Sequence, residues 1–319
     1  MGNNHSSTRA RHGNGTMKLR NKKSKQQLME REEIKESAKS RFHLPKNDQD
    51  IDRMQLQHFL FKHIWEDKNY SSPIEQVLKS GDCRVLDAGC GPGAWLLEMS
   101  TQHPSTKFYG IDIAAVFPSE IKPTNLNFYQ CDINGGLPFE DNYFDFVRMS
   151  LMITSLKADQ WVNVIRELVR VLKPGGHLEL IEKELLVNNA GPHFAFMVKN
   201  IMSFIQSTGI NGYITQQIPF IFSSIPSLIN IRSEARIIPI GPLGGQSGLI
   251  YGELLEMYFK NKLIDVLPRF MNITEKEYLN LWERCQLEFN IHATTTKLFR
   301  FWAQKDVIDD DDDNNNNDN

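Results

Sequence analysis

Short apolar runs alternate with amphipathic stretches along most of this chain, from about residue 50 to residue 305. Apolar runs bounded by glycine, proline or acids are typical of buried strands, and a 3.6-residue apolar period is typical of helices. These criteria predict helices at about 50–64, 74–78, 93–99 and 161–172, and strands at 84–87, 106–111, 126–131, 143–149 and 177–181. Because strands and helices alternate, we predict an α/β fold with a mostly parallel, doubly wound sheet.

The pattern is less regular beyond Glu182. Strands are predicted at 231–240 and 294–303, with helices at 249–267 and 274–289. Between residues 194 and 205, phenylalanine and methionine recur at helical spacing. Such a stripe forms either ordinary core or, because methionine-rich surfaces adapt to apolar ligands, one wall of a binding site. Both interpretations stay open from the sequence.

Both ends of the chain are polar and poor in apolar residues. Seven lysines and arginines precede Glu30 without a single acid, and the final residues are dominated by aspartate and asparagine. Segments of this composition cannot bury enough apolar surface to offset the chain entropy lost on folding. We therefore predict a disordered basic arm at 1–49, one folded domain at 50–305 and a disordered acidic tail at 306–319.

Composition narrows the class of protein. The chain has 319 residues, of which 40% are hydrophobic, and a formal net charge of −3, which suits one catalytic domain with tails. The four cysteines show neither a C-x-x-C pair nor a metal-ligand spacing, so we expect a reduced, cytoplasmic compartment and no bound metal. No stretch resembles a secretory signal or has the length and apolar character of a membrane span.

The most informative stretch is the glycine-rich turn after the predicted strand at 84–87. Four alternating residues define this turn: Asp87, Gly89, Gly91 and Gly93. Glycines permit unusual backbone angles and let a ligand lie against backbone N–H groups at a helix N-terminus. The spacing of Gly89, Gly91 and Ala94 also satisfies a dinucleotide fingerprint. The carboxylate of Asp87 favours instead a ligand with an ammonium and a sulfonium, as in S-adenosylmethionine (SAM).

Two further acids follow predicted strands. Asp112 comes 19 residues after Gly93, close to the ~20 residues expected for an acid that accepts hydrogen bonds from ribose hydroxyls. Asp132 follows the strand at 126–131, where we expect it to accept a hydrogen bond from an adenine amino group. An isoleucine follows each acid, Ile113 and Ile133, and would press on the adenine ring. These residues predict a nucleoside site at one edge of the sheet.

Taken in order, the motifs resemble those of class I SAM-dependent methyltransferases. The run from Asp132 to Gly176 includes Leu137-Pro138-Phe139, Arg166-Glu167-Leu168 and Lys173-Pro174-Gly175-Gly176, and it resembles the methyltransferase domain of ubiquinone- and menaquinone-biosynthesis enzymes. Trp95, Phe117-Pro118-Ser119 and residues 301–305 resemble a fungal branch that includes regulators of secondary metabolism. The resemblance covers roughly residues 50–305. It implies a seven-stranded Rossmann-like sheet, an antiparallel last strand beside the fifth and a lid of inserted helices at about 183–290.

The resemblance also implies which residues of the cofactor site hold each part of SAM. By position, the methionine part of SAM is held by Asp87, Gly89, Gly91 and Gly93, the ribose by Asp112, and the adenine by Asp132 with Ile133. No catalytic residue is assigned. Glu182, His193 and Tyr213 lie where groups on the acceptor side occur, and each has an ordinary structural role as its alternative. The predicted function is methyl transfer from SAM to an unidentified small molecule or protein. A catalytically silent SAM-binding regulator and a nicotinamide-dependent oxidoreductase are the alternatives.

The first residues add a hypothesis about location. Met1 to Ser6 fit the M-G-x-x-x-[ST] pattern for myristoylation of Gly2. One myristoyl chain binds membranes only marginally, so a second signal is needed. The basic run supplies it, with Arg9, Arg11, Lys18, Arg20, Lys22, Lys23 and Lys25. Because the pattern is short, a plain solvated arm is the first interpretation, and a peripheral membrane contact through a myristoylated basic arm is the alternative hypothesis. Because the arm lacks interleaved aromatic residues, nucleic acid is not an expected partner.

Overall fold

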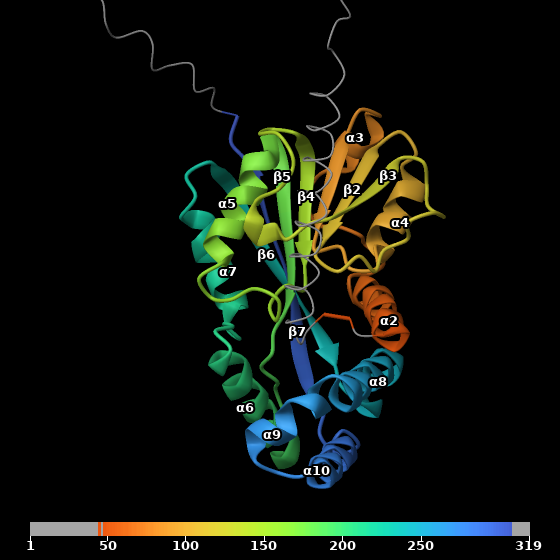
Figure 1. The fold of residues 1–319 in the computed structure, drawn as a ribbon, viewed down its shortest axis with the longest axis vertical. Helices are drawn as coiled ribbons and strands as arrows, with labels where there is room; N and C mark the ends of the chain where they lie inside the picture. The colour runs from red at the N-terminus through yellow and green to blue at the C-terminus, as the bar shows by residue number, and fades with distance from the viewer. Residues whose placement is uncertain (1–43, 46, 308–319) are drawn as a thin grey trace, which may run out of the picture. The chain divides into compact units, whose positions relative to one another are not determined.

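One mixed sheet forms the centre of the fold. The structure is a computed structural model that describes residues 44, 45 and 47–307, so most of the predicted basic arm and acidic tail lies outside the described residues. Within the described part, seven strands pair in the order β3-β2-β1-β4-β5-β7-β6 (Figure 1). They are β1 (Arg84–Ala88), β2 (Lys107–Asp112), β3 (Leu126–Gln130), β4 (Phe144–Ser150), β5 (Leu172–Lys183), β6 (Leu228–Pro239) and β7 (Thr295–Lys305).

The strand directions confirm the predicted doubly wound sheet. The pairs β1–β2, β1–β4, β2–β3 and β4–β5 are parallel. By contrast, β7 runs antiparallel to β5 on one side and to β6 on the other. The last strand therefore inserts beside the fifth, as the resemblance implied. From β1 the strands continue to β2 and β3 on one side and to β4 and β5 on the other, so the strand order reverses between β1 and β4. Open α/β sheets bind ligands outside the carboxyl ends of their strands at such a reversal.

Helices pack on both faces of the sheet and on its extension beyond β5 (Figure 1). Those that flank the parallel strands are α3 (Glu75–Lys79), α4 (Ala94–Gln102) and α5 (Trp161–Val171), whereas α7 (Ile214–Ser223) packs on β6 and β7. The others are α2 (Asp48–Ile64), α6 (Pro192–Ser207), α8 (Gly245–Asn261), α9 (Leu267–Met271) and α10 (Glu275–Glu288), with short 3₁₀ turns at η1 (Ile133–Gly135), η2 (Pro242–Gly244) and η3 (Leu263–Asp265).

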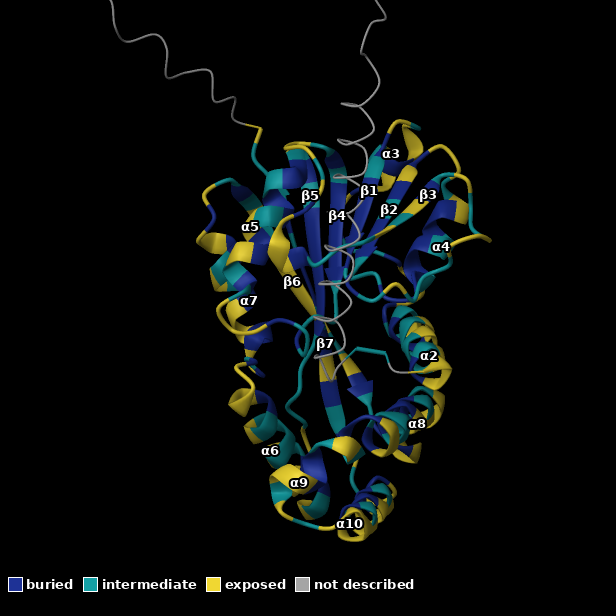
Figure 2. Ribbon diagram, viewed as in Figure 1, coloured by how far each residue is buried: buried dark blue, intermediate teal, exposed yellow. Residues whose placement is uncertain are grey.

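Alternation along the strands divides the core between the two faces. Successive strand side chains point to opposite faces, so Val85 belongs to the buried cluster that includes residues of α3 and α4, whereas Leu86 belongs to the cluster that includes residues of α5. Both side chains are fully buried, and burying one such side chain is worth about 1.5–3 kcal/mol. Figure 2 shows the central strands as predominantly buried. These strands are therefore a rigid support for the loops at their ends.

The inserted helices build a core of their own, which also includes α2. Phe61 of α2, Phe194 of α6, Tyr251 of α8 and Trp282 of α10 are buried in one cluster. Trp282 stacks on Phe259 with ring centroids 4.2 Å apart. Helix α2 is thus packed against the helices of the predicted lid region.

The structure shifts two of the predicted boundaries. Residues 173–176 were expected to stop a helix ahead of a strand at 177, but α5 ends at Val171 and β5 already begins at Leu172. The helix predicted at 249–267 is interrupted, since α8 ends at Asn261 and α9 starts at Leu267 with Pro268 in its first turn. Proline is tolerated in the first turn of a helix and not in its interior, which favours a new start there.

Candidate functional site

A cavity of about 230 Å³ lies at the carboxyl ends of β1 and β4. One part of its wall comes from the glycine turn and the strand ends, with Asp87, Gly89, Gly91, Asp112 and Arg148. We call the other part the acceptor chamber. It is lined by residues of α2, the end of β5, the inserted helices and β7: Arg53, Gln57, Ile181, Lys183, Leu185, Ile201, Ile205, Tyr251, Leu254, Leu255, Tyr258 and Leu298. A single cavity thus joins the predicted cofactor residues to a largely apolar chamber.

The glycine turn has the geometry that its sequence predicts. The backbone φ angles are +73° at Gly89, +52° at Gly91 and +77° at Gly93, which is the residue before α4. Residues with a side chain rarely adopt these angles. A Cβ atom on Gly91 would lie 2.7 Å from Cε of Met54 in α2, and one on Gly89 would lie 2.7 Å from Sδ of Met152. The positive φ angles therefore disfavour side chains in the turn, and the methionine ends would have to move to admit one.

Asp112 ties the end of β2 to this turn. Its Oδ2 accepts a hydrogen bond from the Gly91 N–H over 2.8 Å, and its Oδ1 accepts one from the Ala114 N–H over 2.8 Å. Burial raises the pKa of this carboxyl to about 6, and the two backbone donors oppose that rise. Each carboxylate oxygen has two acceptor positions, so both can still accept a hydroxyl. Asp112 lines the cavity and is placed to hold a diol there.

Asp87 has a partner that the sequence did not predict. Arg148 of β4 stands opposite it in the sheet, and Arg148 Nη1 donates to Asp87 Oδ1 over 2.7 Å. The Arg148 guanidinium also lies over the Trp95 ring, 4.7 Å from its centroid. Burial raises the pKa of Asp87, and Arg148 opposes the rise. A basic residue within the otherwise largely apolar strand at 144–149 was the one available signal of this pair.

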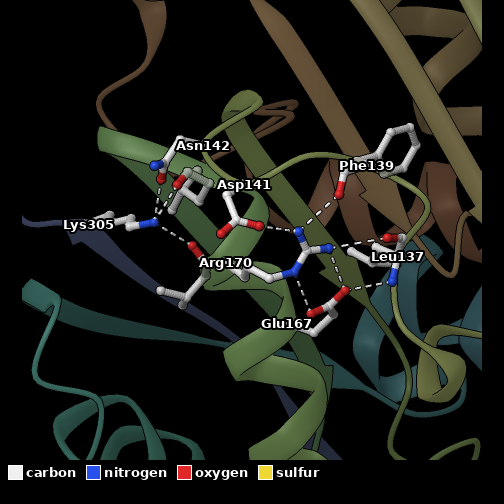
Figure 3. A network of polar contacts seen from close by, with 9 residues as sticks. Leu137, Phe139, Asp141, Asn142, Glu167, Arg170 and Lys305 are labelled. Carbon is white, nitrogen blue, oxygen red and sulfur yellow. Dashed lines mark hydrogen bonds and ion pairs between the residues drawn. The ribbon is translucent and has the colours of Figure 1, made fainter.

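Four of the predicted cofactor residues do not line the cavity. These four are Gly93, Ile113, Asp132 and Ile133. Both isoleucines are buried. Asp132 accepts from the N–H of Asn134 over 3.0 Å, at the start of η1. Their assignment to the turn and to adenine therefore stays a prediction. The loop after η1 is held by Arg170 of α5, which bonds Glu167, Asp141 and two loop carbonyl groups (Figure 3).

Of the three predicted acceptor-side groups, Glu182 and His193 have structural partners and Tyr213 is exposed. Glu182 is buried and accepts from the N–H groups of Met152 (2.6 Å) and Ile153 (3.1 Å), and burial raises its pKa to about 8. His193 Nδ1 lies 2.6 Å from a Glu288 oxygen, and Glu288 also accepts from backbone N–H groups at the start of α6. Tyr213 is 47% exposed. Although none of the three lines the cavity, Glu182 holds Met152 and Ile153, which do.

Helix α2 supplies one wall of the cavity through Arg53, Met54, Gln57, His58, Phe61 and Lys62. Lys62 and His58 both approach Glu98 of α4, which links the wall to the helix behind the glycine turn. Burial, and then Arg148, lower the pKa of His58 to about 4, so this imidazole is neutral at pH 7. Helix α2 therefore covers the site.

The part of the chain that the structure describes contains neither a cluster of metal-ligating side chains nor a helix that could span a membrane. Histidines, cysteines, aspartates and glutamates nowhere gather in threes as a metal site would need within 44–45 and 47–307. Over the same residues, no helix has the length and apolar character to cross a membrane.

Comparison with known proteins agrees with this geometry. Residues 85–176 match a family described as "Methyltransferase domain". The chain is 33% identical over 147 residues to the secondary metabolism regulator laeA of Coprinopsis cinerea, covering 45% of this chain and 36% of that protein. It is 31% identical to methyltransferase pytC of Aspergillus terreus, covering 43% of this chain and 40% of that protein. It is 29% identical to N-methyltransferase verN of Clonostachys rogersoniana, covering 54% of this chain and 61% of that protein. The chain thus spans less than two thirds of the length of these relatives.

Proposed function

We propose that this protein, which carries a class I SAM-dependent methyltransferase domain of the laeA- and pytC-like branch, transfers the methyl group of SAM to a small-molecule acceptor. The observation that carries the proposal is the single cavity in which the glycine turn and Asp112 open into the acceptor chamber. A site that only bound a nucleoside would need no apolar chamber beside it.

The residues present fit the cofactor. The backbone near Gly89 and Gly91 is bare, and a side chain at either position would meet a neighbouring methionine. Asp112 would hold the ribose hydroxyls, and Asp87 would attract the ammonium group of the methionine part. Arg148 lines the cavity beside Asp87, so its guanidinium would attract the carboxylate of the methionine part. When bound, the cofactor supplies a methyl group on a cationic sulfur that accepts the bonding electron pair.

The chain contributes position and exclusion of water, which suffice for an already activated methyl group. Helix α2 and the inserted helices enclose the acceptor against the strand ends. Lys183, whose pKa burial and then Arg53 lower to about 8, is the one lysine of the acceptor chamber. No general base is assigned, because the acceptor atom decides whether a proton must leave.

Labelled-methyl transfer from SAM into a fractionated lysate tests the activity. We expect label to enter the small-molecule fraction with the wild-type chain and not with Gly91→Val. SAM binding without label in any fraction would contradict methyl transfer and fit a silent regulator. Tight NAD binding would contradict the cofactor assignment.

We further propose that the chain is held at a cytoplasmic membrane face by myristoylated Gly2 and the basic residues before Glu30. A myristoyl chain alone gives an association constant of order 10⁴ M⁻¹, and basic residues add about 1 kcal/mol each near an anionic surface. Co-expression of wild type and Gly2→Ala with a myristoyltransferase and an azide-tagged fatty acid tests this. Equal labelling, or no flotation of the wild type on anionic liposomes at ~0.15 M salt, would contradict it.

A further inference from the structure

The acceptor chamber contains two cations and few anions. Arg53 of α2 donates from Nη1 to the Gln57 side chain over 3.0 Å, and the carboxylate of Asp50 lies 3.9 Å from its Nε. Asp50 is shared, because its Oδ2 lies 2.9 Å from Lys262 Nζ. Neighbouring Glu182 directs its oxygens to the Met152 and Ile153 N–H groups. Positive charge therefore exceeds negative charge around this chamber.

The two cations converge on one ring. Lys183 Nζ lies 5.9 Å and the Arg53 guanidinium 5.4 Å from the centroid of the Tyr258 ring. Like charges held near one another and away from water repel, and the pKa of each is lowered, first by burial. A ligand anion in the chamber would be attracted to both cations.

Several donors of the chamber have no partner within residues 44–45 and 47–307. The Lys183 ammonium makes neither a hydrogen bond nor an ion pair there, and buried Arg53 Nε makes no hydrogen bond. The hydroxyl of Tyr251, which is 4% exposed, makes no hydrogen bond to a described residue either. Lys183 and Tyr251 both line the cavity, so their unused donors suit an acceptor of hydrogen bonds that enters with a ligand.

The rest of the chamber is apolar. Ile201 and Ile205 of α6, Leu254 and Leu255 of α8 and Leu298 of β7 line it. In the sheet, Leu298 is paired directly with Lys183, which places the cation at the edge of the apolar surface. A ligand with an apolar body and one charged end matches this arrangement.

We propose that the methyl acceptor is a small molecule with an apolar body and a carboxylate, and that Lys183 and Arg53 bind the carboxylate. The proposal rests on the methyltransferase function above. A monoanion suits the site because Asp50 already neutralises part of the positive charge. The carboxylate fixes which end of the acceptor faces the inserted helices and therefore which end reaches the glycine turn.

Calorimetry with carboxylate probes and their neutral amides tests the proposal without turnover. The full chain is saturated with S-adenosylhomocysteine and titrated with hexanoate, octanoate and 2-naphthoate, and then with the three matching amides. We expect at least one carboxylate to bind saturably and at least tenfold more tightly than its amide. Lys183→Met should weaken that carboxylate roughly ten- to a hundredfold, as for one charge-assisted hydrogen bond, and leave the amide unchanged.

Two control variants separate charge from folding. Lys183→Arg keeps the charge and should retain most of the carboxylate affinity, and Lys276→Met removes an exposed lysine of α10 and should change nothing. Equal affinity for carboxylate and amide, no binding of any carboxylate, or an unaltered Lys183→Met variant would overturn the proposal. Binding of S-adenosylhomocysteine is measured first in every preparation. Its loss from the wild type would contradict the proposed function itself, whereas its retention with no carboxylate binding contradicts only this inference.

Discussion

Arg148 of β4 donates to Asp87 of β1 over 2.7 Å, across two neighbouring parallel strands and directly below the glycine turn. The acid that the sequence assigns to a ligand cation is thus already paired with a protein cation. Both side chains are nearly buried, with 8% and 2% of their surface exposed, and both line the cavity. The pair therefore supports the strand ends and also presents charge to the cofactor site.

Removing one member of this pair should destabilise the fold. Arg148→Met leaves Asp87 buried without its cation, which typically costs about 3–5 kcal/mol. Asp87→Leu should cost a similar amount. The double variant should lose less than the sum of the two, because neither charge is then left alone. Urea unfolding followed by circular dichroism measures all three, with exposed Arg166→Met as the control. Additive losses would contradict the pairing.

The ribose assignment is tested at Asp112. Asp112→Ala should weaken SAM by about 1.5–3 kcal/mol for each charged hydrogen bond lost. Calorimetry with SAM and with NAD provides the measurement, and Asp159→Ala, at an exposed position, is the matched control. An unchanged affinity for SAM in the Asp112 variant would remove this residue from the site.

The same carboxyl predicts a pH dependence of binding. Because burial raises the Asp112 pKa to about 6, the carboxyl is increasingly protonated below that pH and can no longer accept two hydroxyls. Affinity for S-adenosylhomocysteine should be constant above pH 7 and fall up to tenfold per pH unit below pH 6. Asp112→Asn should flatten the profile.

The contribution of Asp112 to stability has the opposite sign. With a folded-state pKa above the unfolded value of 3.8, the folded state binds more protons, so the contribution to the free energy of unfolding falls as pH rises from 4 to 6. Urea unfolding of the wild type and Asp112→Asn across this range separates the two effects. A parallel loss of stability and affinity toward low pH would contradict the assignment.

Gly91 should tolerate no branched side chain. Gly91→Val combines a φ of +52° with a Cβ only 2.7 Å from Met54, so it should abolish SAM binding while the circular dichroism spectrum barely changes. Gly135→Val is the comparison, because a Cβ there meets nothing within 4 Å. Normal SAM binding by the Gly91 variant would show that the turn does not contact the ligand.

Arg170 should stabilise the loop between η1 and β4. Its guanidinium donates to the Leu137 and Phe139 carbonyl oxygens and to Glu167 and Asp141 (Figure 3). Asp141 is 72% exposed, so its bond is screened by solvent and the others dominate. We expect Arg170→Ala to cost about 2 kcal/mol of unfolding free energy and Arg170→Lys less. The Arg166→Ala change at a neighbouring exposed position should leave the free energy of unfolding unchanged. Equal losses for the Arg166 and Arg170 variants would argue against a role of Arg170 in holding this loop.

Much of the fold follows from local patterns. The strands at 84–88, 107–112 and 144–150 are short apolar runs with clear ends, and the glycine turn depends on a backbone conformation that few other residues adopt. The spacing from Gly93 to Asp112 places the acid beside the turn, because a helix and a strand of ordinary length lie between them. The bond from Gly91 N–H to Asp112 Oδ2 was in that sense predictable.

The sequence by itself determined the sheet, the turn and the class of cofactor, because each rests on residues close together in the chain. Only the tertiary structure decided what surrounds them. Strand order, and not spacing, puts Arg148 opposite Asp87. The packing of α2 on α8 brings Arg53 to the ring of Tyr258, and the end of β5 brings Lys183 there. These residues come from α2, β5 and α8, and each alone is an ordinary charged or aromatic residue of its element. Their shared burial creates the unbalanced charge of the chamber, and burial of that kind is a property of the folded chain and not of any one segment.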